Sequence, residues 1–381
     1  MNNLKPFFDA LEKISVGTIE IELPDGKVRK FSSNNPTPNA HIKIKNIEMV
    51  DECLIGGDIA FGEAFINDEW ESNNLADLLL FLAINSHVLE KFFHAHKLKM
   101  ILLYFQALLR KNTYNGSKKN IEYHYDLGNE FYRFWLDETM TYSSALFENN
   151  CDLVLAQKNK YRRILSKLNN EKNILEIGCG WAGFAKEAVL QGYNVTGLTL
   201  SKEQKKYAED LGLKNFTIKL QDYRKEKSKY DNIVSIEMFE AVGRQYWVTY
   251  FKMIRDCLRK GGKAIIQTIT IDDGVALEYK KRVDFIQKYI FPGGVLPSKT
   301  EFIKLAKANN LKLLEAFDFG DDYQKTLLKW LDNFNKAREK IINLGFDEKF
   351  IRKWQFYLAY CAAGFGSKRT SVVQFELTLP S

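Results

Sequence analysis

Histidine is scarce in this chain, and its placement excludes several kinds of catalytic site. The 381 residues include 5 histidines, and none follows His124. The long stretch after it therefore has no histidine base, no Ser-His-Asp triad and no histidine-ligated metal centre. His94 and His96 are two residues apart in a segment with helical periodicity, so their side chains do not share a face. We predict no metal site.

Cysteines and long apolar runs are also limited. The 5 cysteines are scattered, odd in number and without the spacing of metal ligands, which is typical of a reducing compartment. The longest apolar stretches, near residues 78–83 and 100–109, are too short to cross a bilayer. The first residues show no signal-peptide pattern. We therefore expect a cytoplasmic protein, either free or peripherally attached to a membrane.

The most informative stretch that is present runs from Ile174 to Gly183. Apolar residues with strand propensity lead into a turn with Gly178 and Gly180, and a helical segment follows Gly183. Such a junction brings bare backbone and helix N–H groups close to a nucleotide-like ligand. The glycine spacing is that of dinucleotide sites, so the neighbouring residues must decide between ligands.

Two neighbouring features favour S-adenosylmethionine over NAD. Glu176 lies two residues before the first glycine, where its carboxylate can hold the ammonium group at the donor's amino-acid end. The next strand ends in Thr199-Leu200-Ser201, without the acidic residue that holds the ribose hydroxyls in NAD proteins. We expect S-adenosylmethionine, with NAD as the alternative.

Strand and helix patterns alternate from residue 174 onward, which predicts an α/β fold with a parallel sheet and helices on both faces. The predicted strands are 174–177, 195–198, 216–220, 233–236 and 264–271. Residues from about 272 to 298 interrupt the alternation, and we expect them to form a lid over the site.

The N-terminal region has a different pattern and predicts a separate domain. Alternating residues at 18–23 precede a Pro-Asp-Gly turn, a loop rich in Asn and Pro covers 32–39, and helices begin near Leu75. The polar stretch 111–120 is the expected linker. We therefore divide the chain into an accessory domain over residues 1–115 and a catalytic domain over 116–381.

Positive charge is in excess and partly clustered. The chain has 55 Lys and Arg against 48 Asp and Glu, a net charge of +7. Residues 91–119 combine several of these cations with apolar residues at helical spacing, which is typical of a segment resting on anionic lipid. An ordinary surface helix packed on the core is the alternative. No DNA- or RNA-binding motif accompanies the charge, so we expect no nucleic acid partner.

Motifs spread over nearly the whole chain belong together. They are Gly62–Phe65 with Glu69–Trp70, Tyr123–Asn129, Thr141–Ala145, Thr199–Gln204, Gln221–Arg224, Glu237–Gly243, Lys288–Gly294 and Tyr360–Phe365. In combination they closely resemble cyclopropane fatty acid synthases and the related mycolic acid cyclopropane synthases, which are S-adenosylmethionine-dependent methyltransferases. The resemblance implies a class I, Rossmann-like methyltransferase fold with a mostly parallel, doubly wound sheet and a smaller N-terminal α+β domain.

The resemblance also implies an activity. It implies transfer of a methyl group from S-adenosylmethionine to the double bond of an unsaturated acyl chain in a membrane phospholipid, giving a cyclopropane chain. An alkene is a weak nucleophile that needs aligned positioning rather than a base, and aromatic faces can stabilise the carbocation that forms. The implied substrate is an acyl chain of a membrane phospholipid. The charge pattern favours an anionic surface at the inner face of the membrane, and a homodimer is left open.

In the family a bound bicarbonate is thought to remove the proton that closes the ring. The resemblance places its holders, our candidate catalytic residues, at Ser144, Glu240, Gln267, Tyr323 and the backbone of Ile269. Two positions depart from the family, because Ser144 replaces Cys and Gln267 replaces His. Glutamine can donate a hydrogen bond but cannot carry positive charge. Bicarbonate is thus an optional cofactor, and two products stay open: the cyclopropane, or a methylene- or methyl-branched chain from altered proton removal.

The resemblance also implies contacts for each part of the donor. The ribose would contact Thr199, Ser201 and Gln204, and the adenine would contact Asp222 and Tyr223. The amino-acid end of the donor would contact a larger set: Tyr142, Ser143, Glu176, Ile177, Gly178, Cys179 and Gly180. Simpler interpretations exist for some of them. Ser201 fits a helix N-cap, Asp222 can close a turn, and Glu237 with Glu240 fits a helix-face pair.

Cys361 matches a cysteine once assigned as the family's active-site residue and is a further candidate catalytic residue. It lies in an apolar helical run, where a cysteine more often fills space. Two other functions are weighed as well. A small-molecule N-methyltransferase shares the core but not the accessory domain, and an inactive lipid-binding protein would not need the glycine turn, Gln204 and Glu240.

Overall fold

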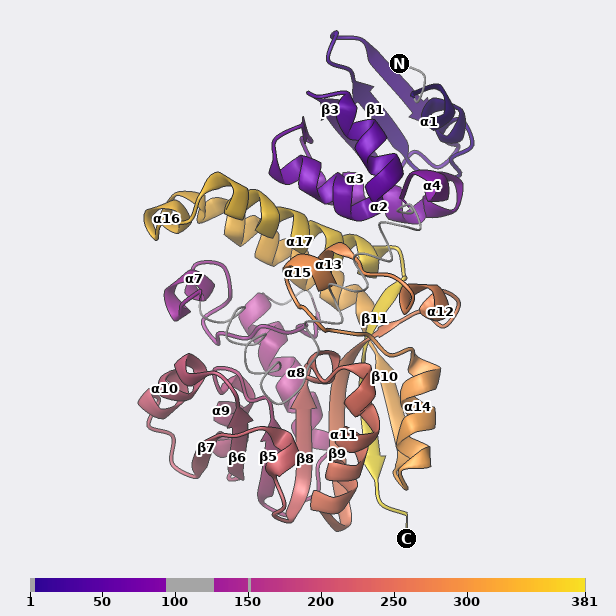
Figure 1. Cartoon of the computed structure of the whole chain (residues 1–381). Coiled ribbons are helices and arrows are strands. Elements are labelled where there is room, and N and C mark those ends of the chain that lie inside the picture. Colours follow the sequence, from indigo (N-terminus) through magenta and orange to yellow (C-terminus); the bar gives the residue numbers. More distant parts are fainter. Residues whose placement is uncertain (1–3, 94–126, 150–151, 381) are drawn as a thin grey trace. The chain divides into compact units, whose positions relative to one another are not determined.

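The computed structural model describes residues 4–93, 127–149 and 152–380 and divides into two compact units (Figure 1). The first unit contains the N-terminal region together with residues 281–290 and 327–369. The second contains most of the chain from 127 to 280, residues 291–326 and the C-terminal strand. The expected boundary at 115, the linker at 111–120 and nearly all of the basic segment 91–119 lie outside the described residues.

One sheet of seven strands organises the described part of the second unit, in the order β10-β11-β9-β8-β5-β6-β7. The strands are β5 (Asn173–Ile177), β6 (Asn194–Thr199), β7 (Phe216–Leu220), β8 (Tyr230–Ile236), β9 (Leu258–Ile271), β10 (Lys312–Asp318) and β11 (Thr370–Thr378). Neighbours among β5 to β9 run parallel, whereas β11 is antiparallel to both β9 and β10. The predicted mostly parallel sheet is confirmed.

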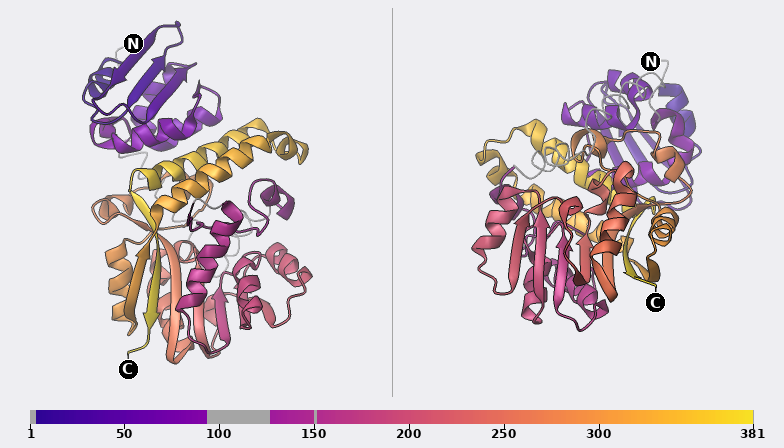
Figure 2. Two further views of the ribbon diagram at one scale, coloured as in Figure 1. Left: turned by 180° about the vertical axis from the view of Figure 1, so that it is seen from behind. Right: turned by 60° about the horizontal axis from the view of Figure 1, so that its bottom comes forward.

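Helices cover both faces of this sheet because successive strand residues alternate between two apolar cores (Figure 2). Ile174 and Val234 face a core that includes residues of α8, α9 and α10, while Leu175 and Ile233 face a core that includes residues of α11 and α14. These helices are α8 (Leu153–Lys167), α9 (Gly183–Leu190), α10 (Lys202–Asp210), α11 (Trp247–Cys257) and α14 (Lys299–Ala308). The doubly wound arrangement is therefore set by two-sided burial of the strands.

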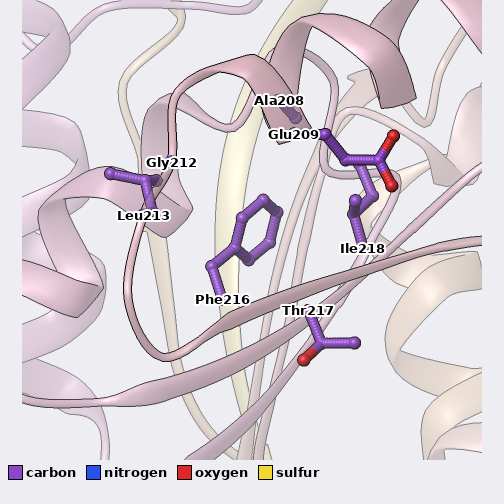
Figure 3. Close-up of a pocket in the computed structure, with 7 residues that line it drawn as sticks. All are labelled: Ala208, Glu209, Gly212, Leu213, Phe216, Thr217 and Ile218. Carbon is purple, nitrogen blue, oxygen red and sulfur yellow. The ribbon is translucent and has the colours of Figure 1, made fainter.

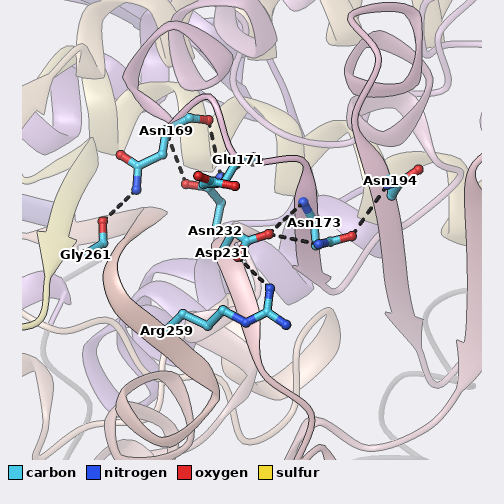
Figure 4. A network of polar contacts seen from close by, with 8 residues as sticks. All are labelled: Asn169, Glu171, Asn173, Asn194, Asp231, Asn232, Arg259 and Gly261. Atoms are coloured by element: carbon cyan, nitrogen blue, oxygen red, sulfur yellow. Dashed lines mark hydrogen bonds and ion pairs between the residues drawn. The ribbon is translucent and has the colours of Figure 1, made fainter.

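The amino-terminal edge of the sheet is held by a polar network (Figure 4). The Asp231 carboxylate accepts hydrogen bonds from the backbone N and Nδ2 of Asn173, at 3.1 and 2.9 Å, and pairs with Arg259 at 2.6 Å. Asn232 accepts a bond from the backbone N of Asn169 at 3.1 Å. Although burial acts to raise it, the bonds from Arg259 and Asn173 lower the pKa of Asp231. These side chains satisfy one another, and the network joins β5, β8 and β9.

The first unit contains a small mixed sheet with the order β2-β1-β3-β4. Its strands are β1 (Thr18–Glu22), β2 (Val28–Ser32), β3 (Asn39–Ile44) and β4 (Trp70–Glu71), with β1 parallel to β3. Its helices are α1 (Leu4–Leu11), α2 (Glu48–Ile66), α3 (Leu75–Ile84), α4 (Ser86–Phe93), α13 (Phe285–Tyr289), α16 (Arg338–Asn343) and α17 (Glu348–Gly366). The expected α+β character of the N-terminal region is thus observed.

Aromatic packing explains why two later segments belong to the first unit, which a division at one boundary does not predict. The Phe356 ring on α17 lies 6.3 Å from Phe61 and 6.0 Å from Phe65 of α2, measured between centroids. Phe285 on α13 lies 4.6 Å from the same ring. The boundary of the second unit falls inside α15 (Gly320–Lys336). Across the described ranges, every helix is too short or too polar to cross a bilayer.

The predicted lid segment, residues 272–298, does interrupt the alternation after β9. It contains α12 (Ala276–Tyr279) and α13, and residues 281–290 within it belong to the first unit. Its last part stays with the sheet, because Ser298 forms a bridge to Ile271 and the Val295 N–H donates to the Glu240 carbonyl at 3.0 Å. Closure over the site stays a prediction.

Candidate active site

The predicted donor residues follow the carboxyl ends of neighbouring parallel strands. β5 ends at Ile177, β6 at Thr199, β7 at Leu220 and β8 at Ile236. In doubly wound sheets ligands bind outside these ends. A separate pocket of about 300 Å³ has a different location (Figure 3). It is lined by Ala208, Glu209, Gly212, Leu213, Phe216, Thr217 and Ile218, at the start of β7, and contains none of the predicted residues.

The turn after β5 requires glycine. Gly178 has φ +79°, and a Cβ there would lie 2.8 Å from Cγ of Met238. Gly180 also has positive φ, at +52°. The N–H groups of Gly178 and Cys179 donate to the Leu198 carbonyl at 3.0 and 2.9 Å, which ties the turn to β6. Side chains at positions 178 and 180 would cover the bare backbone that is predicted to contact the donor.

Glu176 is buried at the end of β5 with an unsatisfied oxygen. Its side chain is 3% exposed, and Oε2 has no hydrogen-bond partner within the described ranges. Burial raises the pKa of this carboxyl well above its usual value. A buried carboxylate oxygen without a partner is costly and calls for a cationic ligand, so the residue fits the donor's ammonium group. Ile177 and Cys179 beside it are buried, and burial raises the pKa of the Cys179 thiol, which is therefore an unreactive group.

The residues that are predicted to contact the ribose form hydrogen bonds with one another. Ser201 caps α10, accepting a hydrogen bond from the Gln204 N–H at 3.2 Å, as the simpler interpretation predicted. The Thr199 hydroxyl donates to Gln204 Oε1 at 2.9 Å and accepts from the Ser201 N–H at 3.1 Å. All three side chains are buried. The turn is therefore rigid, and its contact with a ribose stays a prediction.

Asp222 closes a turn. Its carboxylate accepts bonds from the N–H and Nε of Arg224, at 2.9 and 2.8 Å, and from an Arg224 terminal nitrogen at 2.5 Å. Both carboxylate oxygens are thus held by one buried ion pair. Tyr223 packs edge-on against Tyr250, with centroids 5.5 Å apart. This arrangement supports the simpler interpretation of Asp222, and the adenine contact stays a prediction.

Tyr142 lies in an aromatic cluster next to the predicted donor site. Its ring centroid is 5.7 Å from that of Tyr132, 5.4 Å from Trp135 and 6.5 Å from Phe291. Tyr132 continues the cluster to Trp181, at 5.0 Å, directly after the glycine turn. These rings could not be assigned to the site from composition alone, and their use in the expected carbocation chemistry stays a prediction.

Lys160 is a buried cation in this site that the sequence analysis missed. It lies on α8 and is fully buried, and its Nζ donates to the Ser143 hydroxyl at 2.6 Å. Burial lowers its pKa to about 7, against the opposing effect of Glu237 and Asp137. The sequence does contain a sign that Lys160 is buried, because it lies on the helical stripe that α8 buries. This stripe includes Leu153, Ala156, Gln157, Lys160 and Ile164. A lysine on such a stripe indicates a functional group.

Glu237 is the acceptor on which the predicted proton-removal residues converge. Its Oε1 accepts from the Ser144 N–H at 2.9 Å and from Gln267 Nε2 at 2.7 Å, and its Oε2 accepts from the Tyr323 hydroxyl at 2.5 Å. Burial raises its pKa, an effect that Lys160 opposes. The interpretation of Glu237 and Glu240 as a helix-face pair is wrong. Residue 237 has φ +50° and precedes the short turn η2 (Phe239–Ala241).

Glu240 lies beside this group with its own contacts. Its Oε1 accepts from the Thr268 hydroxyl at 2.9 Å and from the Ile269 N–H, a backbone group that the resemblance assigned to bicarbonate. Its Oε2 is buried without a hydrogen-bond partner in the described part of the chain. Burial, and then the nearby Glu237, raise its pKa to about 8. Glu240 is therefore protonated near neutral pH.

Cys361 does not belong to the same unit as these residues. It belongs to the first unit, on α17, and burial raises the pKa of its thiol. These properties fit the alternative of an unreactive packing residue, and its catalytic role stays an untested prediction. Among the described residues no three His, Cys, Asp or Glu side chains are grouped to hold a metal ion.

Comparisons with known proteins identify the family of the chain. The family model described as mycolic acid cyclopropane synthetase matches residues 112–375. The tuberculostearic acid methyltransferase UfaA1 of Mycobacterium tuberculosis is 36% identical over 337 residues, which are 84% of this chain and 79% of that protein. The cyclopropane-fatty-acyl-phospholipid synthase of Escherichia coli K12 is 32% identical over 368 residues, 92% of this chain and 93% of that one.

A solved structure shows the same fold with a donor product bound. The mycolic acid cyclopropane synthase CmaA1 complexed with SAH and CTAB aligns with a TM-score of 0.63 at 30% identity, over 68% of this chain and 97% of that one. These findings confirm the S-adenosylmethionine cofactor and remove the NAD alternative. This chain belongs to the mycolic acid cyclopropane synthetase family and is an S-adenosylmethionine-dependent methyltransferase with a class I, Rossmann-like fold.

Proposed function

We propose that this protein transfers the methyl group of S-adenosylmethionine to the double bond of an unsaturated acyl chain in a membrane phospholipid and forms a cyclopropane chain. One observation carries the proposal. A donor cradle at the end of β5, with the unsatisfied oxygen of Glu176, shares a sheet edge with a second group of buried carboxylates, Glu237 and Glu240. A relative carries the name cyclopropane-fatty-acyl-phospholipid synthase.

The residues of the site have separate tasks in this reaction. When bound, S-adenosylmethionine supplies a cationic, already activated methyl group, so the attacking alkene needs no base. Glu176 holds the ammonium end, and the glycine turn brings the backbone against the donor. The rings around Tyr142 stabilise positive charge on the acyl chain. Proton removal is assigned to the group formed by Glu237, Glu240 and the side chains that contact them.

A second product is favoured by particular residues. At two positions that the family uses for proton removal this chain has Ser144 and Gln267, and both donate hydrogen bonds to Glu237. Altered proton removal would give a methylene-branched chain, and a saturated methyl-branched chain would need a separate reductant in addition. The relative named tuberculostearic acid methyltransferase has higher identity, 36%, than the named cyclopropane synthase, at 32%.

Lipid analysis in a host without its own synthase tests the proposal and decides between the products. Expression of the protein should add one CH₂ unit to unsaturated acyl chains, and fragmentation in the mass spectrometer should locate a ring at the former double bond. A branched chain would select the second product. Unmodified lipids, with folded protein and donor present, would contradict both.

We also propose that substrate reaches the site from an anionic membrane surface at the inner face, with the protein cytoplasmic and peripheral and the homodimer as its assembly. The basic segment 91–119 supports the membrane contact by its composition. Charge reversal at Lys97, Lys99, Arg110 and Lys111 should weaken sedimentation with anionic vesicles. Unchanged sedimentation would contradict this contact.

A further inference from the structure

The donors that should hold bicarbonate already have an anion in front of them. The Ser144 N–H, the Gln267 amide and the Tyr323 hydroxyl belong to the set that the resemblance assigns to bicarbonate. All three donate to Glu237, at 2.9, 2.7 and 2.5 Å. They come from segments 93, 30 and 86 residues away in the sequence. A carboxylate and a bicarbonate offer the same kind of planar, two-oxygen anion to such donors.

The backbone conformation fixes the position of this carboxylate. Residue 237 directly follows β8 and has φ +50°, a left-handed conformation that non-glycine residues rarely adopt. Its N–H donates to the Gln267 carbonyl at 2.8 Å, so the strained residue is fixed to β9. Conformations of this kind persist where the surroundings enforce them and are concentrated in active sites.

The amide of Gln267 is oriented by a chain of hydrogen bonds. Its Oε1 accepts from Gln374 Nε2 at 3.0 Å, and Gln374 Oε1 accepts from Arg163 at 2.6 Å. Arg163 can only donate, so the direction of the chain is fixed and the Gln267 nitrogen must face Glu237. The replacement of His by Gln thus supplies a neutral donor matched to a permanent carboxylate.

Charge at the site agrees with an anion that belongs to the protein. The buried Lys160 attracts Glu237 electrostatically, and Glu237 in turn adds to the effect of burial in raising the pKa of the neighbouring Glu240. A bicarbonate would lose its three donors to Glu237 and would be repelled by that carboxylate. The residues present therefore do not fit bicarbonate.

We propose that the Glu237 carboxylate is the proton acceptor of this enzyme and stands in the place that bicarbonate has in the family. The inference rests on the proposed function. As the alkene takes the methyl group, a carbon–carbon bond forms, the carbon–sulfur bond breaks with its electrons left on sulfur, and the acyl chain becomes a carbocation. A C–H bond then breaks, its electrons close the ring or form a new double bond, and the proton passes to Glu237, which later releases it to water.

Three proteins test this assignment: the wild type, Glu237→Gly and Glu237→Gln. Methyl transfer to unsaturated phospholipid vesicles is measured in buffer stripped of carbon dioxide, with and without added bicarbonate. The wild-type rate should not depend on bicarbonate. Both variants should lose roughly 100-fold or more in stripped buffer, the usual contribution of a positioned base. Bicarbonate should restore Glu237→Gly, where the donors are uncovered, and not Glu237→Gln, where the amide still fills the position.

Binding gives a second readout that does not depend on activity. With S-adenosylhomocysteine present, ¹³C-labelled bicarbonate should show line broadening with Glu237→Gly and none with the wild type. Bicarbonate binding to the wild type, a wild-type rate that needs bicarbonate, or a Glu237→Gly rate equal to wild type in stripped buffer would overturn the proposal. A wild type that methylates no lipid would instead contradict the proposed function, and the binding experiment would still decide the role of Glu237.

Discussion

Buried acidic groups are paired at one edge of the large sheet and incompletely paired at the other. At the amino-terminal edge, Asp231 is held by Asn173 and Arg259, and these bonds lower its pKa against the effect of burial. At the carboxyl-terminal edge, Glu176 and Glu240 each keep a buried oxygen without a partner among the residues that the structure describes, and burial raises the pKa of both. The strands are the same, so the difference lies in the turns and loops beyond their ends.

This difference separates structural from functional polarity. A satisfied network joins β5, β8 and β9 and needs nothing from outside the protein (Figure 4). Unsatisfied buried carboxylates cost stability and persist where a ligand or a proton completes them. The carboxyl edge is the one that binds donor and substrate in this fold. Replacing charge at each edge should therefore change different properties.

The largest effect is expected for Glu176→Gln. The amide cannot attract the donor's ammonium group, so affinity for S-adenosylmethionine should fall by about 30- to 1000-fold, as when one partner of a buried charge pair is lost. Calorimetry measures it, with the exposed Glu203→Gln as the matched control. Equal affinity in Glu176→Gln and wild type would show that the Glu176 carboxylate does not bind the donor's ammonium group.

Next comes Gly178→Ala, compared with Gly192→Ala. Both residues have positive φ, at +79° and +81°, but of the two only residue 178 would bring its new Cβ against a described neighbour, Met238. Gly192→Ala should lose only the left-handed backbone penalty, about 1–2 kcal/mol, and keep donor affinity. Gly178→Ala should lose more stability and also bind the donor weakly. Urea unfolding and calorimetry measure the two properties, and identical behaviour of the variants would contradict the cradle.

Asp231→Asn tests the other edge and should change stability alone. Loss of charged hydrogen bonds to Arg259 and Asn173 should lower the free energy of unfolding by about 1–3 kcal/mol, with donor affinity unchanged. Because the folded pKa of Asp231 is depressed, this stabilisation is present above its usual pKa of 3.8 and is lost as pH falls through the lower, folded value. A change in donor affinity would break the distinction between the edges.

A pH dependence of stability is expected at Glu240. Its folded pKa is about 8 against a usual 4.5, so between these values the folded protein keeps a proton that the unfolded chain has lost. Wild-type stability therefore declines as pH rises through this window, and Glu240→Gln removes that decline. The unfolding temperature of the variant relative to wild type should be higher at pH 9 than at pH 5. Parallel curves would show that Glu240 has no raised pKa.

Much of the fold could be predicted, because local signals and long-range packing agree there. β7 has its predicted bounds, and the Ser201 cap and the start of α10 were predicted correctly. α2 was missed, since its buried residues surround the helix and Gly57, at φ +65°, interrupts it. An apolar stretch without one buried face gives no helical period.

The site was predictable in its residues more than in its contacts. The glycine turn and Glu176 follow from sequence, but Glu237 acquires its role from three distant segments. Its spacing to Glu240 favoured a helix, and the backbone at 237 breaks that pattern. Lys160 was hidden by its residue type, because a lysine is expected at the surface unless the stripe around it is examined.

One measurement tests most directly that the carboxyl edge transfers methyl groups to acyl chains. Purified protein is incubated with trideuteromethyl-labelled S-adenosylmethionine and vesicles of either unsaturated or fully saturated anionic phospholipid. Mass spectrometry then measures the masses of the acyl chains. Deuterium should enter the unsaturated chains and be absent from the saturated ones. Donor binding without label in any acyl chain, or equal labelling of both lipids, would contradict the account.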